Sequence, residues 1–229
     1  MLEAILSRLQ CADWPAYLAA RSPTPVANVT PGEFLRALYG PDKVVAVFRD
    51  DSEKKPLLWP TSGGESLSSY KFAPKGAKFL IQPGDGQWHG TGDARSCRSE
   101  AACASFPFML LESDAADTSA WLSVLGQFHG QIASICESGK RSIHAMVFIG
   151  AKSKKEWLAR VDPMRDALVT LGADPAAMKA VQLSGLPGCV RGDTGREQRL
   201  LYLDPQYADG PVLPICKRPV IHHKKEPTP

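Results

Sequence analysis

The stretch Phe108–Asp114, with the sequence FMLLESD, says most about the fold of this chain. Apolar residues run directly into two carboxylates that are separated by one serine. A short apolar run of this kind is typical of a buried β-strand, and alternate side chains of a strand share a face. We therefore expect Glu112 and Asp114 to point the same way at the exposed end of a strand. Neighbouring carboxylates repel each other unless a cation lies between them, so the pair predicts a divalent metal site.

A second apolar stretch, Ser142–Ile149, has the sequence SIHAMVFI and predicts another central strand. The same alternation places Ser142 and His144 on a common face. A hydroxyl and an imidazole beside a metal-binding acidic pair would suit nucleotidyl transfer. The alternative for His144 is a buried histidine whose ring nitrogens are satisfied within the core.

Two turns offer donors for phosphate groups. The basic turn Ser138–Ser142 (SGKRS) leads into the second strand, and Lys140, its hydroxyls and the N–H groups around Gly139 are suited to phosphate oxygens. The turn Leu186–Arg191 (LPGCVR) would hold the guanidinium of Arg191 over the sheet as a fork of donors. Its alternative interpretation is a tight turn between strands with no further role.

The composition is that of an intracellular globular protein. The chain has 229 residues, 44% of them hydrophobic and 22% charged, which is enough for one sizeable domain. The apolar runs are strand-length and far short of the roughly 18 residues of a membrane span. The first residues lack the basic region of a signal peptide, so a cytoplasmic location is expected. Six scattered cysteines form no Cys-x-x-Cys pair, which favours free thiols over a zinc site.

The formal charge of +3 is mild, but the basic residues are clustered. Clustered basic side chains on an otherwise neutral protein are compatible with nucleic-acid binding, although a solvated surface is the simpler explanation of each cluster taken alone. The clusters are Lys140–Arg141, Lys152–Lys155, Arg191–Arg199 and Lys217–Lys225.

Hydrophobic periodicity and capping residues predict an α+β (α/β) domain with a small mixed β-sheet flanked by helices. We expect an N-terminal helix and linker over 1–29, a catalytic domain over 30–210 and a flexible basic tail over 211–229. Expected helices span 2–20, from Thr30 to Tyr39, from Asp117 to about Ile132 and 154–171, with a short one from Pro175. Expected strands span 44–48, 78–82, 106–111, 142–149 and 198–203, and 57–92 is otherwise expected to form loops and short β segments.

Four ordered motifs carry a family resemblance. An acid-x-acid strand end is followed by SGKRSIH at 138–144, LPG-x-x-R at 186–191 and QRLLYL at 198–203. In this order they resemble the archaeo-eukaryotic primase superfamily, and most closely the primases and primase-polymerases of phages, plasmids and integrated elements. The resemblance spans about residues 90–205.

The resemblance implies a mixed sheet related to the RNA-recognition fold. It also implies that Glu112 and Asp114 hold Mg²⁺ or Mn²⁺ and are catalytic together with His144. Ser142 and His144 would contact the incoming nucleotide, and Lys140 and Arg191 would complete the grip on its triphosphate.

The chain departs from the family pattern at three points. The first acid is Glu112 where many members have aspartate, and Gly185 stands where relatives with the Leu-Pro-Gly turn often have arginine. A third carboxylate is usual in the family, and here the choice stays open between Asp193 and Asp204.

The expected function is thus a metal-dependent DNA primase or primase-polymerase acting on single-stranded DNA with nucleoside triphosphates. The chain contains no Gly-x-x-x-x-Gly-Lys-Ser/Thr motif, so unwinding would need a separate helicase or replication protein. One alternative is a non-catalytic DNA-binding replication protein that has kept the primase fold. A less favoured alternative is a metal-dependent nuclease that uses the same acids on water.

Overall fold

The computed structural model describes residues 13–50, 52–63, 66–128 and 130–207. The greater part of the helix expected over 2–20, the tail expected over 211–229 and the Lys217–Lys225 cluster lie outside the described residues. In the described part no helix is long and apolar enough to cross a membrane.

Each α-helix begins at a side chain that caps its free backbone N–H groups. Asp13 caps α2 (Trp14–Arg21), and Thr30 forms a capping box with Glu33 at the start of α3 (Pro31–Tyr39). Asp117 caps α4, and Ser153 caps α5. The last two helices span Thr118–Leu125 and Lys154–Thr170, and short 3₁₀ turns cover Leu67–Tyr70, Gly92–Ala94, Glu100–Ala102 and Gly126–Phe128.

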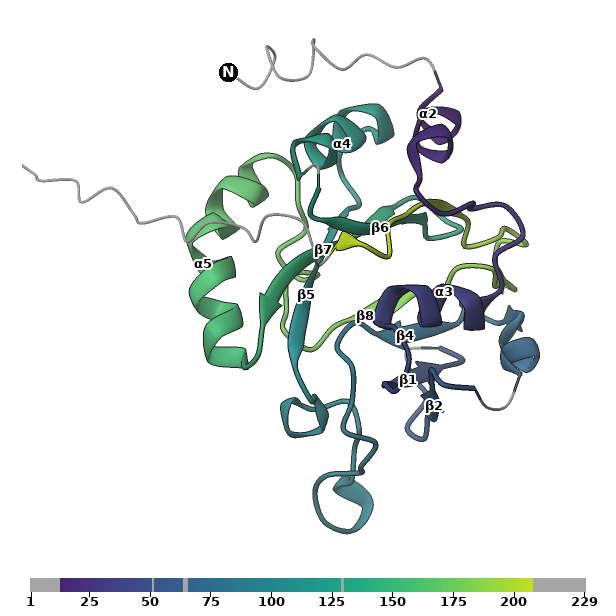
Figure 1. The fold of residues 1–229 in the computed structure, drawn as a ribbon, viewed down its shortest axis with the longest axis vertical. Coiled ribbons are helices and arrows are strands. Elements are labelled where there is room, and N and C mark those ends of the chain that lie inside the picture. The colour runs from purple at the N-terminus through teal and green to yellow at the C-terminus, as the bar shows by residue number, and fades with distance from the viewer. Residues whose placement is uncertain (1–12, 51, 64–65, 129, 208–229) are drawn as a thin grey trace, which may run out of the picture.

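The strands form two four-stranded antiparallel sheets and one parallel pair (Figure 1). The first sheet has the order β2 (Leu57–Pro60), β1 (Val44–Phe48), β4 (Lys78–Leu80) and β8 (Leu183–Gly185). The second has the order β10 (Leu200–Leu203), β6 (Ile132–Glu137), β7 (Ile143–Ala151) and β5 (Phe106–Ser113). The parallel pair joins β3 (Phe72–Ala73) to β9 (Val190–Arg191).

The second sheet is buried on both faces and separates two hydrophobic cores. Met109 and Leu111 of β5 pack with the tryptophans of α4 and α5, Trp121 and Trp157. The alternate residues of β5, beginning with Phe108, face the other core, which α3 and the first sheet share. Figure 1 shows α4 and α5 on one side of the second sheet and α3 with the first sheet on the other. The predicted α+β class is confirmed.

Some predicted elements need correction. The helix expected from Asp117 to Ile132 ends at Leu125, and Ile132–Glu137 is strand β6 in the interior of the second sheet. No helix begins at Pro175, where the chain forms turns. Three strands, β2, β3 and β4, lie within 57–92; β4 was expected by its position, and β2 and β3 are the short β segments expected there without bounds. The helix over 154–170 is confirmed and accommodates Pro163.

Candidate active site

The acidic pair lies where β5 leaves the core. Glu112 is a β5 residue, and Asp114 follows the end of the strand directly. Glu112 continues the face of Phe108 and Leu110, so its side chain emerges between the two sheets. Its side chain is 17% exposed, whereas Asp114 is exposed. The strand thus places one carboxylate at the inner wall and one at the rim of the same opening.

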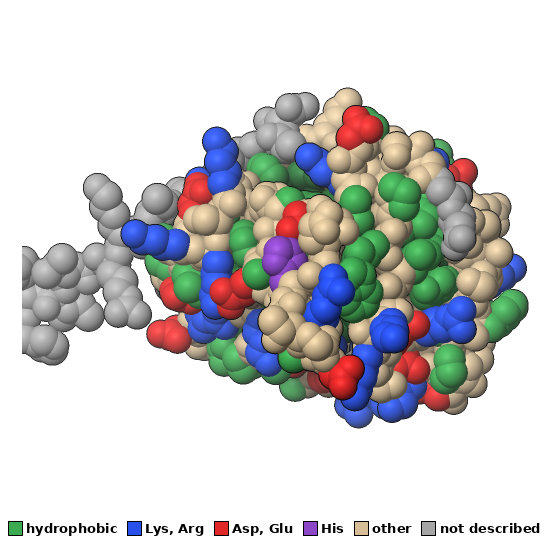
Figure 2. Space-filling model, turned by 90° about the horizontal axis from the view of Figure 1, so that it is seen from below, with side chains coloured by type: hydrophobic (Ala, Val, Ile, Leu, Met, Phe, Trp, Pro, Cys, Tyr) green, Lys and Arg blue, Asp and Glu red, His purple; other side chains and the backbone are tan. Residues whose placement is uncertain are grey.

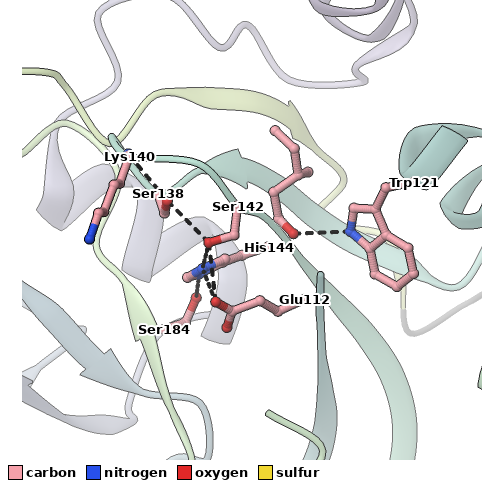
Figure 3. A network of polar contacts seen from close by, with 8 residues as sticks. Glu112, Trp121, Ser138, Lys140, Ser142, His144 and Ser184 are labelled. Atoms are coloured by element: carbon pink, nitrogen blue, oxygen red, sulfur yellow. Dashed lines mark hydrogen bonds and ion pairs between the residues drawn. The ribbon is translucent and has the colours of Figure 1, made fainter. Parts of the chain in front are cut away.

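The register of β5 against β7 places His144 directly opposite Glu112. Residues opposite each other in an antiparallel pair share a face, and here Nε2 of His144 lies 3.2 Å from Oε1 of Glu112. The hydroxyl of Ser142 donates to the same Oε1 at 3.1 Å and lies 3.3 Å from Nε2. The predicted Ser-x-His pair and the first acid of the predicted metal pair therefore form one network (Figure 3).

Two further serines extend this network. Ser138, at the start of the basic turn, lies 3.2 Å from the hydroxyl of Ser142. On the other side of the ring, Nδ1 of His144 lies 3.3 Å from the hydroxyl of Ser184. Ser184 belongs to β8 of the first sheet, so this contact joins the two sheets across the opening (Figure 3).

Opposing influences act on the carboxyl group of Glu112. Burial raises its pKa, but the hydrogen bond and charge of His144, the hydrogen bond from Ser142 and the charge of Lys78 lower it, and the net pKa lies below the ordinary value. Glu112 is accordingly ionised at neutral pH and available to a cation.

A cleft of about 500 Å³ brings all the predicted site residues together. Its walls carry Glu112 of β5 with Asp114 just after that strand, His144 of β7 with Ser142 just before that strand, and residues of β4 and β8. Basic side chains lie around it, namely Lys78, Lys140, Arg141 and Arg191. A cleft with carboxylates on one wall and several cations around it matches a ligand that carries both phosphates and metal.

The basic turn between β6 and β7 forms one side of the cleft. Gly139 has a φ of +72°, which a side chain at this position would strain, and Lys140 N–H donates to the Ser138 hydroxyl at 3.3 Å. Lys140 and Arg141 are exposed and line the cleft. A neighbouring groove of about 380 Å³ shares this turn and adds Arg196 and Arg199, which extends the basic surface away from the acids.

Arg191 reaches the cleft through a gap between glycines. A Cβ on Gly76 would lie 2.7 Å from Cγ of Arg191, and one on Gly139 would lie 3.0 Å from its Cδ. The guanidinium forms a bidentate pair with Asp193, with Nε–Oδ1 and Nη2–Oδ2 distances of 3.0 and 2.7 Å. The hydrogen bond from Arg191 lowers the pKa of Asp193. The turn therefore presents an oriented fork whose position Asp193 helps to fix.

Neither sequence candidate for the third carboxylate lines the cleft. Asp193 is paired with Arg191, and Asp204 accepts hydrogen bonds from its own loop. Asp174 does line it, and its backbone N–H donates to the carbonyl of Glu112 at 2.8 Å. Asp174 was not singled out from the sequence. The contact with β5 arises from tertiary packing, so no local sequence pattern predicts it.

Sequence reasoning also missed two polar residues that line the cleft, Lys78 and Gln198, and it missed Ser184, which lies outside the lining and contacts His144. The amide of Gln198 is buried and donates from Nε2 to the carbonyls of Ala77 and Leu186, at 2.8 and 2.9 Å. A Cβ on Gly185 would lie 2.9 Å from this Nε2. The glycine that departs from the family pattern thus leaves room for the amide that holds the Leu-Pro-Gly turn.

The residues of the cleft fit a divalent cation whose remaining coordination positions are filled by the bound ligand and by water. Among the described residues no group of three or more histidine, cysteine, aspartate or glutamate side chains is arranged to enclose a metal. Mg²⁺ commonly uses only one or two carboxylates together with phosphate oxygens and water. Glu112 and Asp114, facing one cleft with cationic side chains nearby, match that donor set.

No protein-family model and no curated protein matches this chain. Three solved structures are similar to it. The AEP domain of the cyanophage S-2L primase-polymerase is 18% identical, with a TM-score of 0.49 over 79% of this chain and 94% of that one. The catalytic domain of primase RepB′ in complex with initiator DNA is 14% identical, with a TM-score of 0.43 over 78% and 88%. A further structure of primase RepB′ is 12% identical, with a TM-score of 0.44 over 79% and 59%.

Proposed function

We propose that this chain is a metal-dependent nucleotidyltransferase, a DNA primase or primase-polymerase that makes primers on single-stranded DNA during replication of a mobile element. One observation carries the proposal: a single cleft holds Glu112 and Asp114 together with Ser142, His144, Lys140 and Arg191. The order of the sequence motifs supports the assignment to replication. We accordingly place the protein in the cytoplasm, with a separate helicase to open the duplex.

The basic and the acidic side chains of the cleft would bind different groups. Lys140, Arg141 and Arg191 would bind the triphosphate, with the guanidinium of Arg191 supplying two parallel donors. Ser142 orients Glu112 by donating to Oε1, which leaves the second carboxylate oxygen for a cation. Mg²⁺ or Mn²⁺ held by Glu112 and Asp114 would neutralise the developing charge during attack of a 3′-hydroxyl on the α-phosphorus.

His144 would act at the inner end of the cleft. Its Nε2 faces Glu112 and Ser142, and its Nδ1 is held by Ser184, so the ring plane is fixed from both sides. Because both ring nitrogens already have partners, Nε2 would donate to a phosphate oxygen by giving up its contact with Glu112, while Ser184 keeps the ring oriented.

A non-catalytic DNA-binding replication protein is the second candidate. The observation that favours it is that Oε1 of Glu112 is already engaged by Ser142 and His144, while the described residues contain no larger group of metal ligands. In that case the basic residues around the cleft would bind the DNA backbone, and the acids would serve only to orient His144 and the basic turn.

The deciding experiment is synthesis on a single-stranded DNA template with labelled nucleotides and either Mg²⁺ or Mn²⁺. We expect product from the wild type and from Asp204→Ala, whose carboxylate lies outside the cleft, and none from Asp114→Ala. No product with either metal, despite measurable DNA binding, would favour the non-catalytic protein. Shortening of the strand without nucleotides would instead indicate a nuclease.

A further inference from the structure

Phe72 is unusually exposed for an aromatic residue in a strand. Its exposed fraction is 71%, and among the described residues only one other large hydrophobic side chain, Val169 at 39%, is exposed. The next residue of β3, Ala73, is 3% exposed and packs into the core. Because side chains alternate along a strand, the burial of Ala73 directs the ring of Phe72 into solvent.

The backbone around Phe72 is fixed against the strand that carries Arg191. Val190 N–H donates to the carbonyl of Lys71 at 2.6 Å, and Gly192 N–H donates to that of Ala73 at 2.8 Å. In the parallel pairing Phe72 lies beside Val190, and Ala73 lies beside Arg191. Since Arg191 lines the cleft, the exposed ring is held one strand away from the proposed nucleotide site.

Basic side chains flank the ring. Lys71 and Lys75 are exposed in the sequence KFAPK, and Nζ of Lys71 lies 5.6 Å from the centre of the Phe72 ring. The nearby carboxylate of Asp193 is engaged by Arg191. The carboxylate of Asp50 is close enough to Lys75 to interact with the charge of that lysine, so Lys71 is the cation directly beside the ring and complements the charge of a nucleic-acid backbone.

This setting fits a nucleotide chain better than a protein partner. Protein interfaces are built on contiguous apolar patches, whereas Phe72 is a single ring among lysines. A solitary aromatic side chain flanked by cations is the arrangement on which single-stranded nucleic acids stack their bases. On the face shown in Figure 2, basic side chains are interspersed with acidic and hydrophobic ones, so charge alone marks out no track there.

We propose that Phe72 is a stacking platform for a base of the single-stranded DNA template, with Lys71 and Lys75 on the flanking phosphates. The inference rests on the proposed function, because it supplies the template contact that primer synthesis in the adjacent cleft requires. In this arrangement the template strand would run along β3 and past Arg191.

The test is the affinity of the full chain for a labelled oligothymidylate, measured by fluorescence anisotropy without nucleotides or divalent metal. Phe72→Ala is expected to weaken binding about tenfold, within the range found when a stacked aromatic residue is removed. Phe72→Trp should bind like the wild type, and its added tryptophan should be quenched by the DNA. Val169→Ala, the matched exposed apolar control on α5, should change nothing.

An abasic strand of equal length separates stacking from other effects. It should bind the wild type and Phe72→Ala equally, because it offers phosphates but no bases. An unchanged affinity of Phe72→Ala for oligothymidylate would overturn the inference. So would an equal loss on the abasic strand, an absence of binding by the wild type, or a Phe72-dependent change of oligomeric state in sedimentation, which would indicate self-association.

These measurements distinguish the inference from the proposed function. A wild type that binds through Phe72 but makes no product would keep the inference and refute catalysis. A wild type that makes product while Phe72→Ala binds and extends normally would keep catalysis and refute the inference.

Discussion

Glu112 and His144 face each other across the antiparallel pair of β5 and β7, with Oε1 and Nε2 3.2 Å apart. The pairing gives the first acid of the site a fixed neighbour before any ligand arrives. It also means that a change at Glu112 alters both the proposed metal ligand and the environment of the imidazole.

Replacing Glu112 by glutamine should abolish most primer synthesis while the protein stays folded. The amide keeps the size of the side chain but removes the charge that a cation needs, so we expect a loss of about a hundredfold or more. Primer extension with Mg²⁺ and with Mn²⁺ measures the effect, and circular dichroism checks the fold. Activity within a few-fold of wild type would contradict the role of Glu112 as a metal ligand.

The stability that Glu112 contributes should disappear in acid. Its folded pKa is lower than the ordinary 4.5, so the charged form is stabilised in the native state, and that contribution is present above pH 4.5 and lost as the pH falls through the folded pKa. His144, Lys78, Ser142 and Cys136 surround the carboxyl group, and all remain in Glu112→Gln. The difference in unfolding free energy between wild type and Glu112→Gln should shrink below pH 4.5. A difference that is constant across this range would contradict the pKa direction.

Gly185→Ala should destabilise the protein by about 1–3 kcal/mol, the usual cost of overpacking. The added Cβ would lie 2.9 Å from Nε2 of Gln198, and the amide would have to release the carbonyl of Ala77 or Leu186. Urea unfolding measures the cost. A double-mutant cycle with Gln198→Ala should show that the two changes together cost less than their sum. Full additivity would mean that the two positions do not compete for space.

Arg191→Lys should weaken binding of a nucleoside triphosphate about tenfold, because an ammonium group cannot supply the parallel donors of a guanidinium. Arg199 makes a comparable bidentate pair with Glu137 at 3.0 and 2.9 Å but does not line the main cleft, so Arg199→Lys is the matched control. Equilibrium binding of a labelled nucleotide distinguishes the two. Equal losses in both variants would show that the effect is not specific to the cleft.

The sequence predicted the strands whose signal is local. The apolar runs of β5 and β7 and the alternation of their polar ends indicated which residues share a face, and the caps at Thr30 and Asp117 marked where helices begin. Strand β6 was missed because Ile132–Glu137 mixes small, polar and apolar residues. It also follows a helix whose apolar spacing continues as far as Ile132. Burial on both faces of the sheet, a tertiary effect, makes this segment a strand.

The candidate site was predicted only as far as it depends on consecutive residues. Glu112, Asp114, Ser142 and His144 follow from the pattern of single strands. Asp174 and Lys78 reach the cleft through contacts between segments far apart in the chain, such as the hydrogen bond from Asp174 to Glu112. A single sequence contains no signal for such pairings.

The hydroxyl of Ser184 ties the imidazole of one sheet to a strand of the other. A contact of 3.3 Å is near the upper limit for a hydrogen bond, so a small separation of the two sheets breaks it. The contact that orients His144 therefore depends on the distance between the two sheets that form the walls of the cleft. A ligand that draws the walls together shortens this contact, and one that wedges them apart leaves the ring held only through the contacts of Nε2 with Glu112 and Ser142.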